Sequence, residues 1–291
     1  MRDPLVLKNG HLTQAQKDQY WAEGYLFPFQ VASKDQALKW RKSLETIETE
    51  WLDNGLPLPL NTYKRVNAQV VMPLALEIGM HGPTLDVVEG ILGPNVMLYS
   101  VEFLTKEAQT KHVVTMHQDL AYWGMAEMDN ILTAWLALSD ATCLSGCMDF
   151  VRGSHKNPIL EHVDSDDELN MLSRGQEVQV EVAEKDKVAV ELPAGSLSLH
   201  HGLTVHGSGP NASNDRRIGV AIRYVSAEMR KAAGGTDYAI PARGNCTNSG
   251  FQHYAGPSEL FAKKDIEMFD IIRKEQAKVM MDGAQASNNM Y

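Results

Sequence analysis

The sequence of 291 residues predicts a mainly β protein whose core is a sandwich or jelly roll with flanking helices. Three observations predict this fold class. Residues 1–95 space their apolar side chains as helices do, and residues 96–226 break into short β-rich runs separated by turn residues. No internal repeat or linker divides the chain, so we expect one domain over residues 1–291. It would comprise a helical layer (1–95), a β-core (96–226) and a C-terminal loop and helix (227–291).

The helical layer begins with a capping signal. Thr13 can cap a helix start, and Gln16, three residues later, can close a capping box with it. Gly24 is suited to end this helix, because glycine adopts the left-handed backbone conformation of helix ends at little cost. The elements expected next are a strand over Tyr25–Phe29 and helices over Ser33–Leu52, Leu74–Met80 and Pro83–Leu92.

The β-core is predicted from short runs rich in β-branched and aromatic residues. Turn segments such as Pro193–Gly195 and Gly209–Asn211 separate them. The expected strands are Val96–Thr105, His112–Asp119, Ile131–Leu138, Cys147–Val151, Glu177–Val182, Ala189–Glu191, Ser196–His200 and Arg216–Ser226. We also expect a short acidic helix and loop over Asp164–Gly175 and a mostly polar helix over Asp265–Asp282.

Composition and charge argue against several classes of function. The 27 Lys and Arg residues against 37 Asp and Glu give a net charge of −10, which disfavours a nucleic-acid partner. There is no run of about 18 apolar residues, so we expect no membrane span. The N-terminal segment lacks the apolar stretch of a secretory signal, and three cysteines do not make a disulfide framework. We therefore expect a cytoplasmic protein.

Histidine and aspartate residues in the β-core predict a metal site. His117 and Asp119 lie two positions apart in a strand-like run, and residues i and i+2 of a strand point to the same face. The segment Leu197–His206 offers a third ligand from far along the chain. Two imidazoles and one carboxylate form a facial triad that holds Fe(II) and leaves three adjacent positions open for oxygen chemistry. A structural zinc site would instead close its shell with four protein ligands.

On these motifs the sequence resembles the phytanoyl-CoA dioxygenase-like family of Fe(II)/2-oxoglutarate-dependent dioxygenases. The segments that carry the resemblance are Leu12–Leu26, Met116–Leu120 with its His-Gln-Asp motif, Trp135–Leu138, Gly146–His155 and His206–Tyr224. The resemblance implies a double-stranded β-helix, the cupin-like form of the jelly roll. It also implies Fe(II) as the metal, with 2-oxoglutarate and O2 as cosubstrates.

The resemblance assigns roles in the metal site. His117, Asp119 and His206 match the iron ligands and would carry catalysis. Related halogenases replace the carboxylate with a small residue so that chloride can bind the iron, so Asp119 disfavours halogenation. The expected reaction is hydroxylation of an unactivated C–H bond, with conversion of 2-oxoglutarate to succinate and CO2.

A cosubstrate site is implied beside the metal. Arg217 matches the arginine that binds the distal carboxylate of 2-oxoglutarate through a charge-assisted fork. Alternation along its strand puts Gly219 and Ala221 on the same face, where they would leave room for a cosubstrate. Arg216 and Arg223 stay open as alternatives for the same role. Further candidates for the cosubstrate pocket are Ser208, Trp135 and, on the strand face of Trp135, Thr133.

The substrate is less constrained. Tyr122 and Trp123 follow the motif and are candidates for the pocket wall. Arg65 and Asn67 belong to an alternating polar pattern over Asn61–Gln69, which indicates either an extended segment at the pocket mouth or an ordinary solvent-facing edge. This polar edge, and the lack of a basic cluster near the motif, favour a small polar or zwitterionic metabolite such as an amino acid, a betaine or an aminophosphonate. A hydrophobic natural product or an acyl-CoA is the alternative substrate, and a non-catalytic ligand sensor is the alternative function.

The histidines that flank the motifs are expected to be structural. Hydrogen-bonded roles outweigh metal ligation for His112, His200 and His201. His155, within a Gly-Ser-His turn, is expected to close that turn.

Overall fold

Two mostly antiparallel sheets and a set of helices make up the described part of the chain. The computed structural model describes residues 2–122, 125, 128–163, 169–172, 177–178, 182–230 and 236–280. Its helices are α1 (Gln14–Glu23), α2 (Lys34–Trp51), α3 (Leu60–Arg65), α4 (Pro73–Gly79), α5 (Gly82–Leu92) and α6 (Lys263–Met280).

The strands form a large and a small sheet. In spatial order the large sheet contains β1 (Tyr25–Gln30), β9 (Ser196–His201), β4 (Ile131–Ala137), β11 (Arg217–Ser226), β2 (Val96–Lys106), β12 (Tyr238–Arg243) and β13 (Gln252–His253). The small sheet contains β3 (Val114–His117), β10 (His206–Ser208), β5 (Met148–Val151) and β8 (Lys187–Val190), while β6 (His162–Val163) pairs with β7 (Glu177–Val178).

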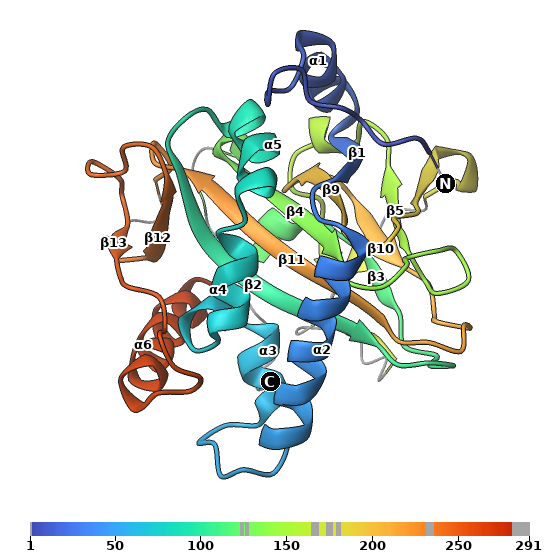
Figure 1. Ribbon diagram of the computed structural model, residues 1–291. Helices are drawn as coiled ribbons and strands as arrows, with labels where there is room; N and C mark the ends of the chain where they lie inside the picture. The colour runs from blue at the N-terminus through green and yellow to red at the C-terminus, as the bar shows by residue number, and fades with distance from the viewer. Residues whose placement is uncertain are drawn as a thin grey trace.

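This architecture is a double-stranded β-helix with a helical layer on one side. Helices α2, α4 and α5 lie in front of the central strands of the large sheet in Figure 1. The small sheet packs on the opposite face, where Phe150 of β5 contacts Tyr25 of β1 with 5.2 Å between ring centroids. The predicted mainly β fold with flanking helices is confirmed. The division of one domain into residues 1–95, 96–226 and 227–291 stays a prediction.

Local sequence signals set the helix ends. The Gln16 N–H donates to Thr13 Oγ1 at 3.3 Å, and the Thr13 N–H donates to Gln16 Oε1 at 2.8 Å, so the predicted capping box forms. Gly24 ends α1 with a left-handed φ of 88°. Ser33 caps α2 by accepting a hydrogen bond of 3.1 Å from the Gln36 N–H. The expected helices α2, α4 and α5 are found within one residue of their predicted ends.

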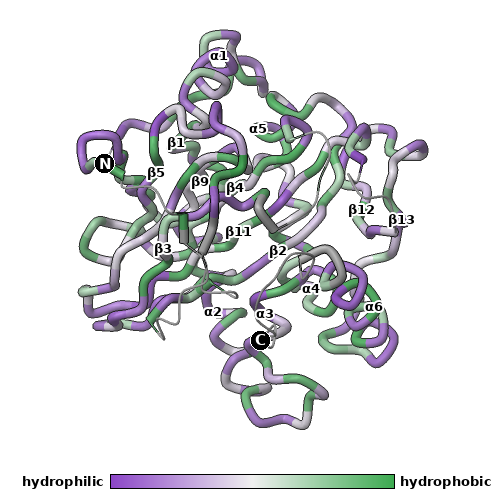
Figure 2. The backbone as a smooth tube through the Cα atoms, turned by 180° about the vertical axis from the view of Figure 1, so that it is seen from behind, coloured by the Kyte–Doolittle hydropathy of each residue, from purple (hydrophilic) through white to green (hydrophobic). Residues whose placement is uncertain are grey.

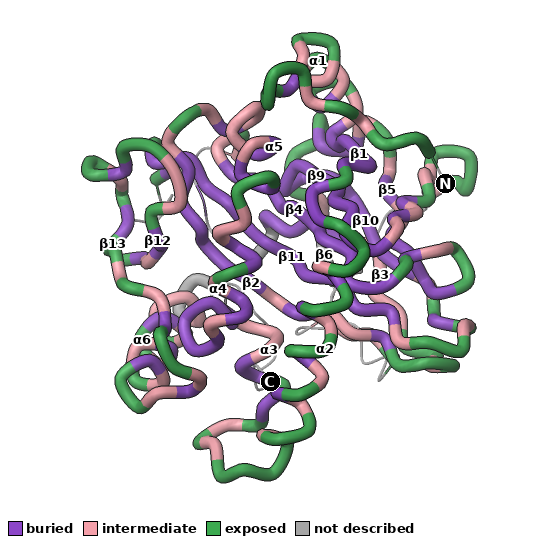
Figure 3. Tube along the Cα trace, in the orientation of Figure 1, coloured by how far each residue is buried: buried purple, intermediate pink, exposed green. Residues whose placement is uncertain are grey.

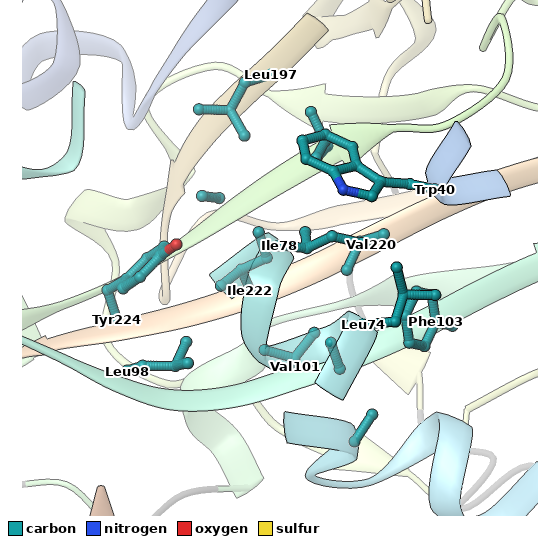
Figure 4. Packing of buried hydrophobic residues seen from close by; sticks show 14 of the residues in the cluster. Trp40, Leu74, Ile78, Leu98, Val101, Phe103, Leu197, Val220, Ile222 and Tyr224 are labelled. Carbon is teal, nitrogen blue, oxygen red and sulfur yellow. The ribbon is translucent and has the colours of Figure 1, made fainter. Parts of the chain in front are cut away.

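The main hydrophobic core lies between the helices and the outer face of the large sheet. Ile218, Val220 and Ile222 alternate along β11 and are fully buried on this face. Figure 4 shows Trp40 of α2 and Ile78 of α4 close to Val220 and Ile222. Each buried aliphatic side chain stabilises the fold by about 1.5–3 kcal/mol. The helical layer thus anchors the sheet and leaves its inner face for a site.

Burial and hydropathy follow the same division. Strands β9, β4 and β11 are buried throughout in Figure 3, and β11 is buried at each of its positions from Arg217 to Ser226. Figure 2 shows hydrophobic stretches on the central strands and polar stretches on outer elements such as α1. Because successive strand residues face opposite sides, the inner face of β11 carries Arg217, Gly219, Ala221 and Arg223. These residues face away from the helical layer.

The prediction of an extended segment over Asn61–Gln69 is wrong. Its first part is helix α3, and a 3₁₀ turn over Ala68–Val70 follows. Leu60 and Tyr63, one helical turn apart, are both buried in the main core. Packing of these two side chains decided the conformation, and the alternation of polar residues was coincidental.

Other departures concern short strands. Strand β10 was not predicted, because three residues that include Gly207 become a strand only through pairing with β3 and β5. The predicted strand His112–Asp119 is shortened to β3. Much of Asp164–Gly175 lies outside the described residues, whereas the expected C-terminal helix is present as α6.

None of the helices in the described ranges is both long and apolar enough to cross a lipid bilayer. The cytoplasmic location stays a prediction.

Candidate metal and cosubstrate site

Two histidines meet across neighbouring strands. His206 of β10 is directly paired with His117 of β3, and the two ring centroids lie 4.2 Å apart. Nδ1 of His117 lies 2.9 Å from the carbonyl oxygen of Thr115, and Nδ1 of His206 lies 2.9 Å from that of Thr204. Because a carbonyl oxygen only accepts, Nδ1 carries the proton in both rings. In the neutral form of each ring, Nε2 then presents a lone pair.

Asp119 completes the cluster from a turn. Strand β3 ends at His117, and Asp119 begins the 3₁₀ turn Asp119–Tyr122, so the prediction that one strand presents both side chains is wrong. Asp119 Oδ1 nevertheless lies 3.6 Å from Nε2 of His117 and 3.9 Å from Nε2 of His206. The three ligand atoms fall within 4.8 Å of one another.

Residues at one level of the large sheet surround this carboxylate. Thr133 of β4 is the register partner of both Arg223 of β11 and His200 of β9. The Thr133 hydroxyl donates to Asp119 Oδ2 at 2.7 Å, and Nη2 of Arg223 lies 3.6 Å from Oδ1. Burial alone would raise the pKa of the Asp119 carboxyl, but the Arg223 guanidinium and neighbouring imidazoles hold it well below its usual range. The carboxylate is therefore ionised and ready to bind a cation.

The donor set fits a ferrous ion. Two imidazole lone pairs and one carboxylate oxygen are the donors of the facial triad. Among the described residues, no further His, Cys, Asp or Glu joins His117, Asp119 and His206 in the cluster. An ion held by these three atoms would keep open positions in its shell, as catalytic metal sites require.

Arg217 is buried at the start of β11 without a counter-charge. Its side chain is 2 % exposed, and within the described ranges it forms no hydrogen bond or ion pair. Arg216 instead pairs with Glu48 at 2.8 Å, and Arg223 pairs with Glu102 at 2.5 Å. Burial lowers the pKa of Arg217 to about 10, so the group is still charged at neutral pH. A buried guanidinium of this kind is suited to bind an anion.

The indole of Trp135 fills the space beside Arg217. A Cβ atom at Gly219 would lie 1.8 Å from the indole ring, so the prediction that this glycine leaves room for a cosubstrate is corrected. The indole ring of Trp135 occupies the space beside Gly219. The Arg217 guanidinium lies over the indole, 5.4 Å from the ring centroid. Nε1 of Trp135 is buried and has no hydrogen-bond partner among the described residues, so it offers a second donor close to the guanidinium.

Sequence reasoning missed a second buried cation, Lys106. This last residue of β2 is the register partner of Arg217 and is 1 % exposed. Its Nζ donates to the Ser208 carbonyl oxygen at 3.1 Å, to the Ser208 hydroxyl at 2.7 Å and to the Gly209 carbonyl oxygen. Burial, together with the Arg217 charge, lowers the pKa of this ammonium to about 7. The signal was a lysine directly after an apolar strand that was predicted to stop at Thr105.

Comparison with known proteins agrees with this geometry. The profile of the phytanoyl-CoA dioxygenase (PhyH) family matches residues 5–219. The chain belongs to this family. The PhyH family is part of the Fe(II)/2-oxoglutarate-dependent dioxygenase superfamily, so the resemblance seen in the motifs is confirmed.

Individual relatives match part or nearly all of the chain. A probable phytanoyl-CoA dioxygenase of Caenorhabditis elegans is 26% identical over 163 residues, which cover 54% of this chain and 52% of the relative. A probable alpha-ketoglutarate-dependent hypophosphite dioxygenase of Stutzerimonas stutzeri is 30% identical over 159 residues, which cover 53% of this chain and 54% of the relative. The chain thus spans about half the length of these curated relatives. Among solved structures, the apo form of the non-heme monooxygenase ThoJ shares 26% identity with a TM-score of 0.82, covering 92% of this chain and 98% of that chain.

Some expected pocket residues of this PhyH-family chain have other contacts. The hydroxyl of Thr133 is bonded to Asp119, so Thr133 positions the carboxylate and does not offer its hydroxyl to a cosubstrate. The side chain of Tyr122 and all of Trp123 lie outside the described residues.

The two polar residues expected at the pocket mouth differ from each other. Asn67 is 1 % exposed and donates from Nδ2 to Gln276 Oε1 of α6 at 2.6 Å, so it joins two elements of the fold. Arg65 donates from Nη2 to the Met171 carbonyl oxygen at 2.8 Å. After burial, the charge of Arg65 contributes to the lowered pKa of Arg217.

His112 and His201 make the hydrogen bonds expected of structural histidines, whereas His155 contacts helix α1 and does not close its own turn as predicted. The contacts are His201 Nε2 to Asp129 Oδ1 (3.0 Å), His155 Nε2 to the Trp21 carbonyl oxygen (3.1 Å) and His112 Nδ1 to the Thr110 hydroxyl (2.8 Å). His200 differs, because neither ring nitrogen has a hydrogen-bond partner among the described residues.

Proposed function

We propose that the protein is an Fe(II)- and 2-oxoglutarate-dependent oxygenase that hydroxylates an unactivated C–H bond of a small polar or zwitterionic metabolite. One observation carries this proposal. A three-ligand cluster from β3, the turn after it and β10 contacts Thr133 of the large sheet, and the inner face of that sheet also carries a buried arginine without a counter-charge. The cluster suits a metal with open positions, and the arginine suits the distal carboxylate of a 2-oxo acid.

Each part of the site has a role in this proposal. His117, Asp119 and His206 would hold the ferrous ion on one face. Arg217 would bind the distal carboxylate of 2-oxoglutarate, and a charge-assisted hydrogen bond of this kind contributes about 1.5–3 kcal/mol.

The neighbours of Arg217 support the same use of the site. The positive charge of Lys106 and the indole N–H of Trp135 add to the attraction for an anion. Once bound, the ion and cosubstrate supply the oxidising chemistry, with succinate and CO2 as products. The chain's own part is to bind, to orient and to exclude water.

The charges next to the metal ligands support a polar substrate. Nη1 of Arg223 lies 2.5 Å from Glu102 Oε1, and the same guanidinium approaches Asp119. These charged side chains make the surroundings of the cluster polar, which suits a polar substrate better than an apolar one. The relative named as a hypophosphite dioxygenase would take a small anion, which agrees with this class. The relatives named as phytanoyl-CoA dioxygenases make an acyl-CoA the rival substrate.

Anaerobic titration of the apo-protein with Fe(II) and 2-oxoglutarate tests the cofactor assignment. A weak visible metal-to-ligand absorption band should develop only when both are present. Asp119→Ala should lose the band and the hydroxylation activity, because the carboxylate donor is gone. Failure of the wild-type protein to develop the band would end the proposal, and so would full hydroxylation by Asp119→Ala.

A substrate panel read by succinate release tests the substrate class. Amino acids, betaines, aminophosphonates and hypophosphite would be compared with acyl-CoA esters and apolar natural products. We expect succinate to form in step with a hydroxylated product for a polar compound. Coupled turnover by the acyl-CoA or apolar compounds alone would contradict the polar class, and ligand binding without succinate would favour the sensor alternative.

A further inference from the structure

His200 is a third imidazole directly behind the group of candidate metal ligands, His117, Asp119 and His206. It lies on the inner face of β9, and its side chain is 1 % exposed. Neither Nδ1 nor Nε2 has a hydrogen-bond partner within the described ranges. Buried polar groups without partners are rare in folded proteins, so an unsatisfied imidazole at a candidate active site calls for a functional explanation.

In the part of the chain that the structure describes, Asp119 is the one acidic residue in ion-pair range of Nε2 of His200. The rings of Phe150 and His206 pack against it, with centroid distances of 5.0 and 4.5 Å. Nε2 lies 3.4 Å from Oδ2 of Asp119, within ion-pair range but outside hydrogen-bond geometry. A movement of a few tenths of an ångström would turn this approach into a hydrogen bond.

His200 and Thr133 face the same carboxylate oxygen. They are register partners on neighbouring strands, and the Thr133 hydroxyl already donates to Oδ2 of Asp119 at 2.7 Å. The other oxygen, Oδ1, is the one that faces the Nε2 atoms of both histidine ligands. The two carboxylate oxygens of Asp119 thus have different neighbours: Oδ2 faces Thr133 and His200, whereas Oδ1 faces the two histidine ligands and, at 3.6 Å, Nη2 of Arg223.

We propose that His200 is a positioning residue that donates its Nε2–H to Asp119 Oδ2 and so restricts Asp119 to metal binding through Oδ1 alone. This inference rests on the proposed function. A carboxylate that bound the ion through both oxygens would occupy one of the positions needed by 2-oxoglutarate and O2. Two donors on Oδ2 prevent this, because each would lose its hydrogen bond when that oxygen turned to the metal.

A matched pair of variants isolates the donor. His200→Gln keeps an N–H donor on a side chain of suitable reach. His200→Met introduces a side chain of nearly the same shape as glutamine but without a donor. His200→Phe adds a variant that keeps a ring. The apo-proteins are first compared by circular dichroism and thermal unfolding, and affinity for Co(II) and then for 2-oxoglutarate is measured by anaerobic calorimetry and by the visible Co(II) spectrum.

We expect His200→Gln to bind Co(II) and 2-oxoglutarate almost as the wild type does. His200→Met and His200→Phe should bind Co(II) about 10- to 100-fold more weakly, as is typical when a partner of a metal ligand is lost. Their Co(II) spectrum should indicate a higher coordination number, and 2-oxoglutarate should change it less. If one donor-free variant fails to fold, the other completes the comparison with His200→Gln.

Two results would overturn the inference. One is a donor-free variant that binds Co(II) and 2-oxoglutarate as the wild type does. The other is a His200→Gln protein as impaired as His200→Met, since this would assign the imidazole a different role, such as a fourth metal donor. A wild-type protein that binds neither Co(II) nor 2-oxoglutarate would count against the proposed function itself, so the two failures are distinguishable.

Discussion

The hydroxyl of Thr133 donates a hydrogen bond of 2.7 Å to Oδ2 of Asp119, although the two residues belong to different layers of the fold. Thr133 lies on β4 in the middle of the large sheet, whereas Asp119 follows β3 of the small sheet. This bond therefore fixes the carboxylate of the metal cluster relative to the rigid sheet opposite. Hydrogen bonds from other residues to the side chains that bind a metal orient these side chains and tune the affinity of the site for the metal.

Removal of this bond should weaken metal binding. Thr133→Val keeps the shape of the side chain but leaves Oδ2 of Asp119 without its hydroxyl donor. We expect Co(II) affinity, measured by calorimetry, to fall about 10- to 100-fold. Thr133→Ser, which retains the hydroxyl, should stay close to the wild type. Equal Co(II) affinity in Thr133→Val and the wild type would show that the bond does not position the carboxylate.

Arg217 should control the affinity for 2-oxoglutarate. Arg217→Ala removes the buried guanidinium, and the Kd for 2-oxoglutarate should rise about 10- to 150-fold, because charge-assisted hydrogen bonds contribute about 1.5–3 kcal/mol. Arg217→Lys should recover only part of this, because an ammonium cannot form the two-pronged contact.

The neighbouring arginine is the control for this prediction. Arg216 pairs with Glu48 and Glu107 away from the inner face, so Arg216→Ala should leave the Kd for 2-oxoglutarate unchanged. Titration of all three variants, followed by the metal-to-ligand band, measures the effect. A loss of affinity that is larger in Arg216→Ala than in Arg217→Ala would move the carboxylate contact to Arg216.

Lys106 should make 2-oxoglutarate binding pH-dependent. Its pKa is lowered to about 7, so the charged fraction in the free protein falls as the pH rises above 7. A bound dicarboxylate favours the charged form and raises this pKa, so binding takes up a proton. Affinity should therefore be greatest below pH 7 and weaken by up to about tenfold for each pH unit above it.

Calorimetry between about pH 7 and 9, in two buffers of different ionisation enthalpy, measures both the Kd and the proton uptake. Lys106→Met should bind 2-oxoglutarate more weakly and with a flatter pH profile. An unchanged slope in this variant would assign the proton to another group.

Gly219 should be intolerant of a methyl group. In Gly219→Ala the new Cβ would lie 1.8 Å from the Trp135 ring, so the indole over which the Arg217 guanidinium lies must move. We expect the free energy of unfolding to fall by about 1–3 kcal/mol, as overpacking does, together with weaker 2-oxoglutarate binding. Gly82→Ala is the control, because a Cβ there meets no atom within 4 Å. Chemical denaturation measures the free energy of unfolding of both variants. Equal values for Gly219→Ala and Gly82→Ala would contradict the packing of Trp135 against Gly219.

Local signals explain why so much of the outer architecture was predictable. The capping box of Thr13 and Gln16 acts within one turn of helix, and the apolar spacing of α2 depends on residues of that helix alone. The prediction for the segment Asn61–Gln69 was wrong because contacts with distant segments, and not local signals, decided its conformation. Its alternating polar residues suggested an extended chain, but burial of Leu60 and Tyr63 in a core built from distant segments made it helical.

The amino-acid sequence by itself determined the helical layer, the central strands and the chemical identity of the site, since the His-x-Asp motif, a distal histidine and Arg217 are legible as residue types and spacings. Only the tertiary structure decided which side chains serve those groups: Thr133 and His200 behind Asp119, and Lys106 opposite Arg217. The physical reason is that these contacts arise from pairing and burial between strands far apart along the chain. A pattern within one strand carries no information about which residue its neighbour presents at the same level.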